Sequence, residues 1–292
     1  MTRHQLTVDV RGPWSLATSR GFWEGFAPNA LSVDAADDTL RTVFRVDADW
    51  SRAEAAVTQS GTRATVTVDG DGDLDAAAEQ TLRFLSLDVD ATDWPAVGRR
   101  DPVVADAQQR LPGLRPCGFH SPYEAAAWAV LSQRVRIVQA AKLREDLVRR
   151  HGDDGAFPAP EALRGLDLDL PKPKADYLRA VADAALDGVL NGRYLRGLEP
   201  DFARAELREI HGIGPFAADL VLVRGASAPD VLPLHEHRLD AEIAYRYGES
   251  RALADIADAW RPFRSWAAVH LRALREVRTA EISGGASNSR RT

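Results

Sequence analysis

Alternating apolar and polar residues mark three segments in the first third of the chain, namely 5–10 (QLTVDV), 39–47 (TLRTVFRVD) and 63–70 (RATVTVDG). This period of two, with many β-branched residues, predicts half-buried strands. Residues 73–87 have a longer period, which would direct Ala77, Leu82 and Leu85 toward a core from one face of a helix. The N-terminal part is therefore expected to combine strands with a helix.

From about residue 101 the spacing of the apolar residues becomes that of helices. Residues 121–135 open with Ser121, Pro122 and Glu124, which is the arrangement of a capping box. Further helices are predicted at 137–152, 170–188, 201–210, 215–225, 238–248 and 265–280. The predicted fold class is α+β, with a small β-containing N-terminal domain at 1–100, an all-α domain at 101–282 and a disordered polar tail at 283–292.

The composition removes several classes of protein. The chain of 292 residues has one cysteine, Cys117, so neither a disulfide framework nor a Cys-ligated metal site is expected. The sequence has no long apolar run and no apolar leader, so we expect no membrane association and a cytoplasmic location. The net charge of −6 argues against nucleic-acid binding, but residues 131–152 are locally rich in arginine and lysine.

The acidic run DGDGD at 69–73 invites comparison with a calcium-binding loop. Counted from Asp69, the sixth position is Leu74 instead of glycine, and the twelfth is Gln80 instead of glutamate. We therefore interpret the run as a turn between a strand and a helix.

The segment 207–222 (LREIHGIGPFAADLVL) predicts two helices joined by Gly212, Ile213 and Gly214. Glycines in such a turn allow a positive φ and let another backbone approach closely. The start of the second helix would present unpaired N–H groups, which favour an anion such as a DNA phosphate. A plain αα-hairpin with a glycine turn explains the spacing equally well.

Residues 207–222 resemble the helix-hairpin-helix motif of the helix-hairpin-helix DNA glycosylase superfamily. Other segments resemble the 3-methyladenine DNA glycosylase II group: 110–135 resembles the entry to its helical core, 224–233 the approach to its catalytic acid, and 260–271 its C-terminal helix. These segments occur in the family's order and cover about 110–280. The N-terminal domain matches the family only in length and class.

The resemblance implies an enzyme that binds double-stranded DNA, flips a damaged nucleotide into a pocket and hydrolyses its N-glycosidic bond. It implies that Gly212, Ile213 and Gly214 bind the backbone of the strand carrying the lesion. It also implies a sodium or potassium ion on the backbone carbonyls of Arg208, Ile210 and Ile213. No other cofactor is expected.

The stretch 230–242 (DVLPLHEHRLDAE) contains four acidic residues and two histidines. The family carries its catalytic Asp six residues after the Asp of a D-V pair. Counting from Asp230 reaches Glu236, whose side chain is one methylene longer. A carboxylate there would stabilise the developing oxocarbenium charge or orient the attacking water. The alternative is that Glu236 is only a first-turn acid favoured by the helix dipole.

The neighbours of Glu236 have simpler interpretations. Glu242 is expected in i,i+4 pairs on a solvated face, and Asp230 is expected to cap or turn the connecting loop. His235 and His237 lack further nearby ligands for a metal, so they are expected to contact DNA phosphates or to tune Glu236. Three isolated histidines are expected to be structural: His120, His211 and His270.

Related bifunctional glycosylases carry a Lys nucleophile two residues after the second hairpin glycine, where this chain has Phe216. Because phenylalanine cannot form a Schiff base, the resemblance implies a monofunctional enzyme without lyase activity. Aromatic faces attract cationic bases in the alkylbase family. Phe216 keeps one such face and Trp128 is assigned to the same pocket, whereas Leu220, Arg272 and Ala273 replace other aromatics. Arg272 would oppose a cationic base, which leaves open a neutral base or a collapsed pocket.

Residues 132–135 (SQRV) match the family's loop that fills the gap left by the flipped base. The resemblance implies that Arg134 is the wedge and that Gln133 faces the opposite base. A guanidinium can stack within a duplex and can also contact phosphate. The alternative is a solvent-facing arginine at a helix end.

The resulting hypothesis is a monomeric, monofunctional glycosylase that removes damaged, in the first place alkylated, bases in base-excision repair at the nucleoid. A non-catalytic protein that binds damaged or distorted DNA on the same fold is the alternative, because the family's Asp and several aromatics are replaced. A helical protein that binds no DNA is a third hypothesis, favoured by the net charge of −6.

Overall fold

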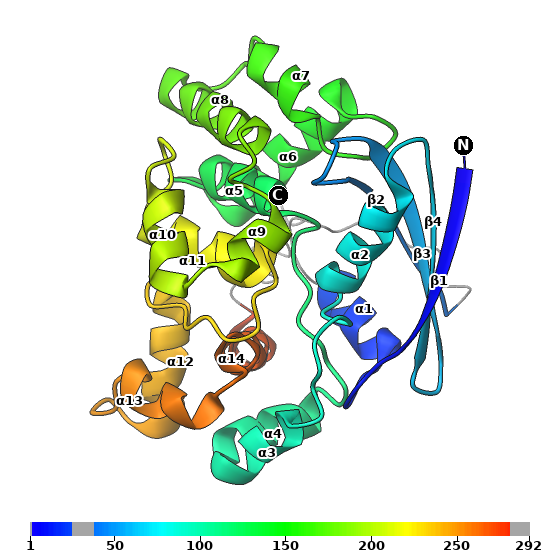
Figure 1. Cartoon of the computed structure of the whole chain (residues 1–292). Helices are drawn as coiled ribbons and strands as arrows, with labels where there is room; N and C mark the ends of the chain where they lie inside the picture. Colours follow the sequence, from blue (N-terminus) through cyan, green and yellow to red (C-terminus); the bar gives the residue numbers. More distant parts are fainter. Residues whose placement is uncertain (1, 25–37, 281–292) are drawn as a thin grey trace, which may run out of the picture.

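The computed structural model describes residues 2–24 and 38–280, whose helices and strands are arranged as in Figure 1. A four-stranded antiparallel sheet with the order β1-β4-β3-β2 forms one side of the molecule. Its strands are β1 (Thr2–Asp9), β2 (Leu40–Arg45), β3 (Arg52–Ser60) and β4 (Arg63–Gly70).

Two helices cover one face of this sheet, α1 (Leu16–Glu24) and α2 (Leu74–Phe84). Because side chains alternate along a strand, Val66 and Val68 of β4 point into an apolar core that also contains Trp23. Asp73 caps α2 by accepting a hydrogen bond from the N–H of Ala76 at 2.9 Å. The acidic run before α2 is thus a strand-to-helix turn, as predicted.

The second apolar core surrounds α5 (Pro122–Leu131), every residue of which is buried. Ser121 caps it by accepting from the N–H of Glu124 at 3.2 Å, as predicted. Burial alone would raise the pKa of the Glu124 carboxyl, but bonds and charges from His120 and Arg144 lower it to about 2. The other elements of this region are α6 (Ile137–His151), α7 (Pro160–Gly165), α8 (Lys172–Leu186), α9 (Gly192–Gly197), α10 (Pro200–Arg208), α11 (Pro215–Leu220) and the π-helical turn η2 (Val221–Gly225).

A third apolar cluster joins helices from distant parts of the chain. They are α3 (Trp94–Arg100), α4 (Pro102–Arg110), α12 (His237–Tyr247), α13 (Leu253–Ala257), the 3-10 turn η3 (Asp258–Trp260) and α14 (Arg264–Thr279). The rings of Trp94 and Trp266 lie 5.7 Å apart, and Asp101 accepts from the indole N–H of Trp260 at 2.7 Å. The boundary predicted between residues 100 and 101 falls between α3 and α4, which contact each other, and the division into domains stays a prediction.

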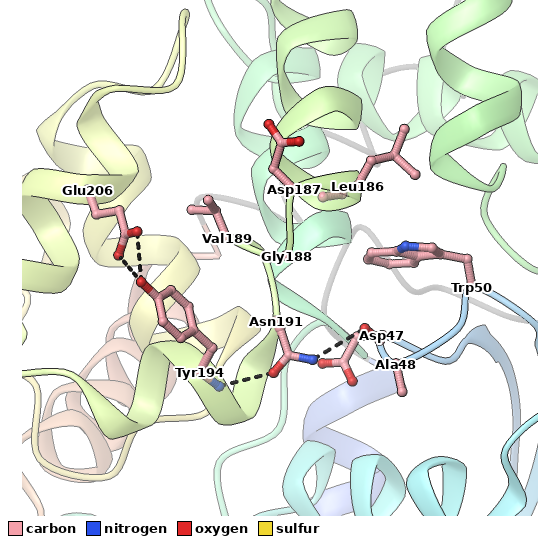
Figure 2. A pocket seen from close by; sticks show the side chains of 11 residues that line it. Asp47, Ala48, Trp50, Leu186, Asp187, Gly188, Val189, Asn191, Tyr194 and Glu206 are labelled. Carbon is pink, nitrogen blue, oxygen red and sulfur yellow. Dashed lines mark hydrogen bonds between the residues drawn. The ribbon is translucent and has the colours of Figure 1, made fainter.

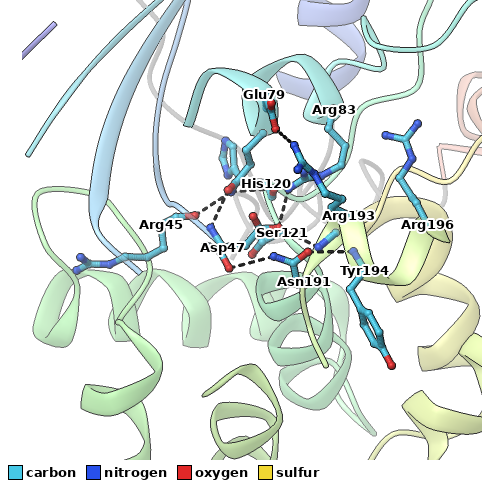
Figure 3. A network of polar contacts seen from close by, with 12 residues as sticks. Arg45, Asp47, Glu79, Arg83, His120, Ser121, Asn191, Arg193, Tyr194 and Arg196 are labelled. Carbon is cyan, nitrogen blue, oxygen red and sulfur yellow. Dashed lines mark hydrogen bonds and ion pairs between the residues drawn. The ribbon is translucent and has the colours of Figure 1, made fainter. Parts of the chain in front are cut away.

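A buried polar network ties the sheet to the helices (Figure 3). Asp47, which follows β2, accepts from Arg83 Nη2 at 2.6 Å and from the N–H of Gly192 at 2.9 Å. Asn191 Nδ2 donates to the carbonyl of Asp47 at 3.2 Å. Because the side chains of Asp47 and Arg83 are only 6% and 8% exposed, this ion pair needs both of its members in place.

The predicted α+β fold, with all strands in the N-terminal part and only helices after it, is confirmed. The sequence pattern does not predict β3, α1, α3, α4, α7, α9 or α13. The helix predicted at 121–135 ends at Leu131, and the one predicted at 215–225 becomes π-helical after Leu220. The tail predicted at 283–292 lies outside the described residues. Within the described part of the chain, no helix is long and apolar enough to cross a bilayer.

Candidate active site

A cavity of about 650 Å³ opens among α5, α11, α14 and the start of α12. Its wall contains every residue that the sequence assigned to catalysis or to the substrate pocket: Trp128, Phe216, Leu220, Glu236 and Arg272. The chain brings these side chains together from four separate segments. The same wall includes Phe22, Ser132, Val135, Asp219, Arg224 and Ala273.

Glu236 is the N-cap of α12 and also lines the cavity. Its Oε1 accepts from the N–H of Arg238 at 3.1 Å, while its Oε2 lies 3.8 Å from Nε of Arg272. That second distance is longer than a hydrogen bond, and the Glu236 side chain is 23% exposed. The two interpretations of Glu236 as a helix acid and as a cavity carboxylate are therefore compatible in one side chain.

The prediction that Glu242 lies on a solvated face is wrong. Glu242 is fully buried and accepts from Arg246 Nε and Arg278 Nη2, both at 2.6 Å, with Arg275 Nη1 at 3.8 Å. The i,i+4 pair with Arg246 exists, but α14 covers it and contributes the other two arginines. Glu242 is therefore a buried anion held by cations from two helices.

The remaining polar residues of the 230–242 stretch have distinct partners. Asp230 accepts from the backbone N–H and from Nε of Arg264, both at 3.0 Å, so it caps the start of α14 rather than its own loop. His237 is 98% exposed, whereas Nδ1 of His235 lies 2.9 Å from Oδ2 of Asp219. In the described residues, no cluster of three or more His, Cys, Asp or Glu side chains could hold a metal ion.

The histidines expected to be structural, His120, His211 and His270, lie outside the cavity wall. His120 is buried with Nε2 2.7 Å from Oγ1 of Thr42. His270 is fully buried, and burial lowers its pKa to about 4. His211 packs against the ring of Tyr177. The burial of His120 and His270 agrees with structural roles, whereas His211 is exposed and its role stays a prediction.

The two glycines of the hairpin turn serve different purposes. Gly212 has φ of 95°, and a side chain there would collide with the ring of Tyr177. Gly214 has φ of −93°, so its backbone does not require glycine, and no described atom lies within 4 Å of where its Cβ would be. Ile213 between them is buried. The open space beside Gly214 is where another backbone can approach the turn.

The loop after α5 is bonded to this hairpin. Gln133 Nε2 donates to the carbonyl of Gly212 at 2.8 Å, so the amide predicted to face a base is engaged with protein. Lys174 Nζ donates to the carbonyls of Leu131 and Gln133 at 2.7 and 3.1 Å. Arg134 is exposed and has φ of 55°, a left-handed conformation that is rare for a residue with a side chain.

The carbonyls predicted to bind a monovalent cation belong to the same turn. The carbonyl of Ile210 accepts from the N–H of Ile213 at 2.9 Å. A carbonyl oxygen has two lone pairs, so this bond leaves Ile210 able to bind a cation. The ion itself, on Arg208, Ile210 and Ile213, stays a prediction.

Comparison with known proteins identifies the relationship. No family model matches the chain. The DNA-3-methyladenine glycosylase of Bacillus subtilis (strain 168) is 26% identical over 207 residues, covering 64% of this chain and 68% of that protein. The probable bifunctional transcriptional activator/DNA repair enzyme AlkA of Mycobacterium tuberculosis is 28% identical over 286 residues, covering 91% of this chain and 56% of that protein.

A solved structure gives the same answer for the fold. The 3-methyladenine DNA-glycosylase from Archaeoglobus fulgidus matches with a TM-score of 0.73 and 19% identity, covering 94% of this chain and 99% of that one. The chain is thus similar in sequence to a DNA-3-methyladenine glycosylase, and its fold is similar to that of a solved one. It nevertheless spans only a little over half the length of the mycobacterial relative, so the activity of that whole protein does not transfer directly.

Asp219 is a residue of this site that the sequence analysis does not find. It is 2% exposed, lines the cavity and accepts from Arg204 Nε at 2.7 Å. Its other oxygen accepts from the N–H groups of Leu234 and His235, at 2.9 and 3.2 Å. An available signal was an aspartate within the apolar run PFAADLVLV, since a buried carboxylate must have partners.

Arg224 is the second cavity residue that the analysis does not find. Its guanidinium lies 5.2 Å from the ring centre of Phe22, and its Nη2 donates to the carbonyl of Cys117 at 2.9 Å. Burial lowers the pKa of Arg224 to about 10, which still leaves it charged at neutral pH. With Arg272, it gives the wall two guanidinium groups.

A second cavity, of about 510 Å³, lies between the sheet and the helices α8 to α10 (Figure 2). Its wall includes Asp47, Trp50 and Asn191, together with Tyr194, whose hydroxyl lies 2.8 and 3.0 Å from the carboxylate oxygens of Glu206. It shares no lining residue with the first cavity. We therefore place the candidate active site in the first cavity.

Proposed function

We propose that the protein is a monofunctional DNA N-glycosylase that acts in base-excision repair. Its substrates would be damaged bases in duplex DNA, chiefly alkylated ones. The observation that carries this proposal is the cavity wall itself. A carboxylate, Glu236, and two aromatic side chains, Trp128 and Phe216, line one cavity. Phe216 follows the hairpin turn directly, and Ser132 and Val135 of the neighbouring loop line the same cavity.

The cavity suits a flipped nucleobase. Its volume of about 650 Å³ lies within the range of about 300–1,000 Å³ that is usual for small-molecule sites. Phe216 is 45% exposed, which leaves a ring face available for stacking on a planar base. Stacking between a base and an aromatic side chain contributes about 1–3 kcal/mol, enough to offset part of the free energy of flipping.

The chemistry assigned to Glu236 follows from its charge. When the C1′–N bond breaks, its electron pair leaves with the base, and positive charge develops on the sugar. A carboxylate beside that sugar stabilises the charge and orients the water that forms the new C1′–O bond. When the C1′–N bond of a cationic alkylated purine breaks, the released base is neutral. Such a base therefore departs without a proton from the protein.

The open space at the hairpin turn and the exposure of Arg134 support the DNA contacts that we assign to the hairpin and the loop. The open space at Gly214 admits a phosphodiester backbone, and the same space would be reduced by any side chain. Arg134 is exposed next to Ser132 and Val135, which line the cavity, so its guanidinium is placed to fill the gap left by a flipped base. The strained backbone at Arg134 is of the kind that clusters at functional sites.

The absence of lyase activity is part of the proposal. The lysines of the chain are Lys142, Lys172 and Lys174, and none of them lines the cavity formed by the described residues. A Schiff base with the sugar needs an amine beside C1′. Reduction with borohydride during turnover should therefore trap no covalent protein–DNA adduct.

The remaining parts of the proposal concern partners and place. Hydrolysis as described needs no cofactor, although a sodium or potassium ion on the carbonyls of Arg208, Ile210 and Ile213 would stabilise the hairpin against phosphate. We propose that the protein acts as a monomer on DNA at the nucleoid.

Single-turnover base release is the experiment that tests this proposal. Duplexes carrying one alkylated, deaminated or oxidised base are mixed with excess wild type, with Glu236→Gln, or with the matched control Glu249→Gln, whose residue is exposed beyond α12. Loss of the charge at position 236 should slow release by about 100-fold or more, while Glu249→Gln should act like wild type. Tight binding to duplexes without release of any base would overturn the enzymatic proposal.

A non-catalytic protein that binds damaged DNA is the alternative that one observation favours. Glu236 already caps α12 and faces Arg272 at 3.8 Å, so its carboxylate has partners without a substrate. The same experiment distinguishes the two functions. The alternative predicts salt-dependent binding to damaged duplexes, with no base release by either wild type or Glu236→Gln.

A further inference from the structure

Asp219 and His235 form a hydrogen-bonded pair beside Glu236. Nδ1 of His235 lies 2.9 Å from Oδ2 of Asp219. Because a carboxylate only accepts hydrogen bonds, Nδ1 carries the proton and Nε2 is left as the basic nitrogen. The Asp219 side chain is 2% exposed, whereas the His235 side chain is 45% exposed, so the pair connects a buried anion to an accessible imidazole.

The bonds to Asp219 go beyond what its burial requires. Arg204 Nε, at 2.7 Å, already supplies the opposite charge that a buried carboxylate needs. The N–H groups of Leu234 and His235 then fix the loop that leads to Glu236. The imidazole bond adds a fixed ring orientation and a fixed tautomer, which are the features that a proton acceptor needs.

One member of the pair lines the cavity, and the other, His235, is exposed directly before the lining residue Glu236. Asp219 itself lines the cavity, as do Pro233 and Glu236, the residues on either side of Leu234 and His235. His237 offers a contrast, because it is 98% exposed and lies beyond Glu236 on the first turn of α12. The sequence analysis assigns His235 and His237 the same candidate roles. The hydrogen bond to the buried carboxylate of Asp219 distinguishes His235 from His237.

We propose that His235, oriented by Asp219, accepts the proton of the water that attacks C1′ in the base-release reaction. This inference rests on the proposed glycosylase function. The water oxygen forms the C1′–O bond, its proton moves to Nε2 of His235, and the electron pair of the C1′–N bond leaves with the base. Glu236 stabilises the charge on the sugar, while Asp219 acts as a positioning residue that stabilises the imidazolium.

This division of work predicts a pH dependence with a definite sign. His235 can accept the proton of water only while its Nε2 is unprotonated. The rate of release should therefore fall as the pH is lowered. The charged and titratable groups around the pair are Asp219 of α11, Arg204 and Asp201 of α10, Glu236 and Arg238 at the start of α12, and Arg272 of α14.

The test uses the full chain and the lesion-bearing duplex that wild type cleaves fastest. His235→Asn keeps an N–H near the position of Nδ1, so the bond to Asp219 can persist, but it removes the basic nitrogen. We expect its single-turnover rate at pH 8 to fall by about 100-fold, within the usual range for general base catalysis. Its rate should also lose the decrease between pH 8 and 5.5, while the dissociation constant for the duplex stays within about twofold of wild type. His4→Asn, which changes an imidazole of β1 outside the cavity wall, is the matched control and should leave the rate, the pH profile and the affinity unchanged.

Asp219→Asn gives a second readout. The imidazole would lose its orienting acceptor, so we expect a slower rate with a shifted pH profile. His235→Asn remains the decisive variant if Asp219→Asn fails to fold.

Several results would overturn the inference. One is His235→Asn releasing base at the wild-type rate, and another is a slower variant that keeps the wild-type pH profile. A third is weaker duplex binding with an unchanged maximal rate, which would make His235 a phosphate contact. Each of these requires an active wild type, so it leaves the proposed function intact, whereas a wild type that releases no base from any duplex overturns both proposals together.

Discussion

The two halves of the segment from Asp230 to Tyr247 hold their acids in opposite ways. In the middle of α12, Glu242 is fully buried and accepts from two arginines at 2.6 Å, with a third at 3.8 Å. Glu236 at its start is partly exposed to a cavity, with Nε of Arg272 at 3.8 Å, beyond hydrogen-bonding distance. The lesson is that a buried carboxylate with direct hydrogen bonds to arginines maintains the fold, whereas a cavity carboxylate without such a close contact from Arg272 keeps its charge available to a ligand.

The largest effect should come from the buried acid. Glu242→Gln would leave Arg246, Arg275 and Arg278 without their shared anion. Breaking a buried ion network by removing one partner destabilises by about 3–5 kcal/mol, and urea denaturation would measure this. Glu249→Gln, which changes an exposed acid two residues after the end of α12, should leave the stability almost unchanged. Equal stabilities of the two variants would break the comparison.

An intermediate effect is expected from the cation beside the cavity acid. Arg272→Gln removes one positive charge from the wall, so a cationic alkylated base should be released faster, by about tenfold, which corresponds to about 1.4 kcal/mol. A neutral oxidised or deaminated base should gain much less. Comparing both substrates under single-turnover conditions separates a charge effect from a general change of the site, and a slower release of both would show that Arg272 itself binds substrate.

The smallest effect should be that of Glu236→Gln on stability. The amide oxygen of glutamine can still accept from the N–H of Arg238, so the cap at the start of α12 survives in part. Losing a cap altogether destabilises by about 1 kcal/mol, and we expect less than that in urea denaturation. A loss as large as that of Glu242→Gln would mean that both acids have the same structural role.

Much of the fold and of the site could be predicted because it is encoded locally. Ser121, Pro122 and Glu124 mark the start of α5 within four residues, and the glycine turn marks the hairpin. Strand β3 escapes because its segment (RAEAAVTQS) has a single β-branched pair, Val57 and Thr58, among alanines and polar residues. Its place is set by pairing with both β2 and β4 rather than by its own pattern.

The parts of the site that could not be predicted depend on distant segments. An i,i+4 pair such as Glu242 and Arg246 has the same spacing whether it faces solvent or lies under another helix. Only the position of α14, which carries Arg275 and Arg278, decides the outcome. In the same way, the bond from His235 to Asp219 depends on the path of the chain after η2, which no local spacing specifies.

The bond from Gln133 to the carbonyl of Gly212 has a mechanical consequence. It fastens the turn that carries Arg134 to the turn that is open toward a phosphate, and Lys174 braces the first of these from α8. Under the proposed function, the spacing between Arg134 and the hairpin turn is thereby fixed before DNA binds. The duplex must then supply the deformation that exposes a damaged nucleotide. Nucleotides at sites where stacking is already weakened should therefore be flipped most readily.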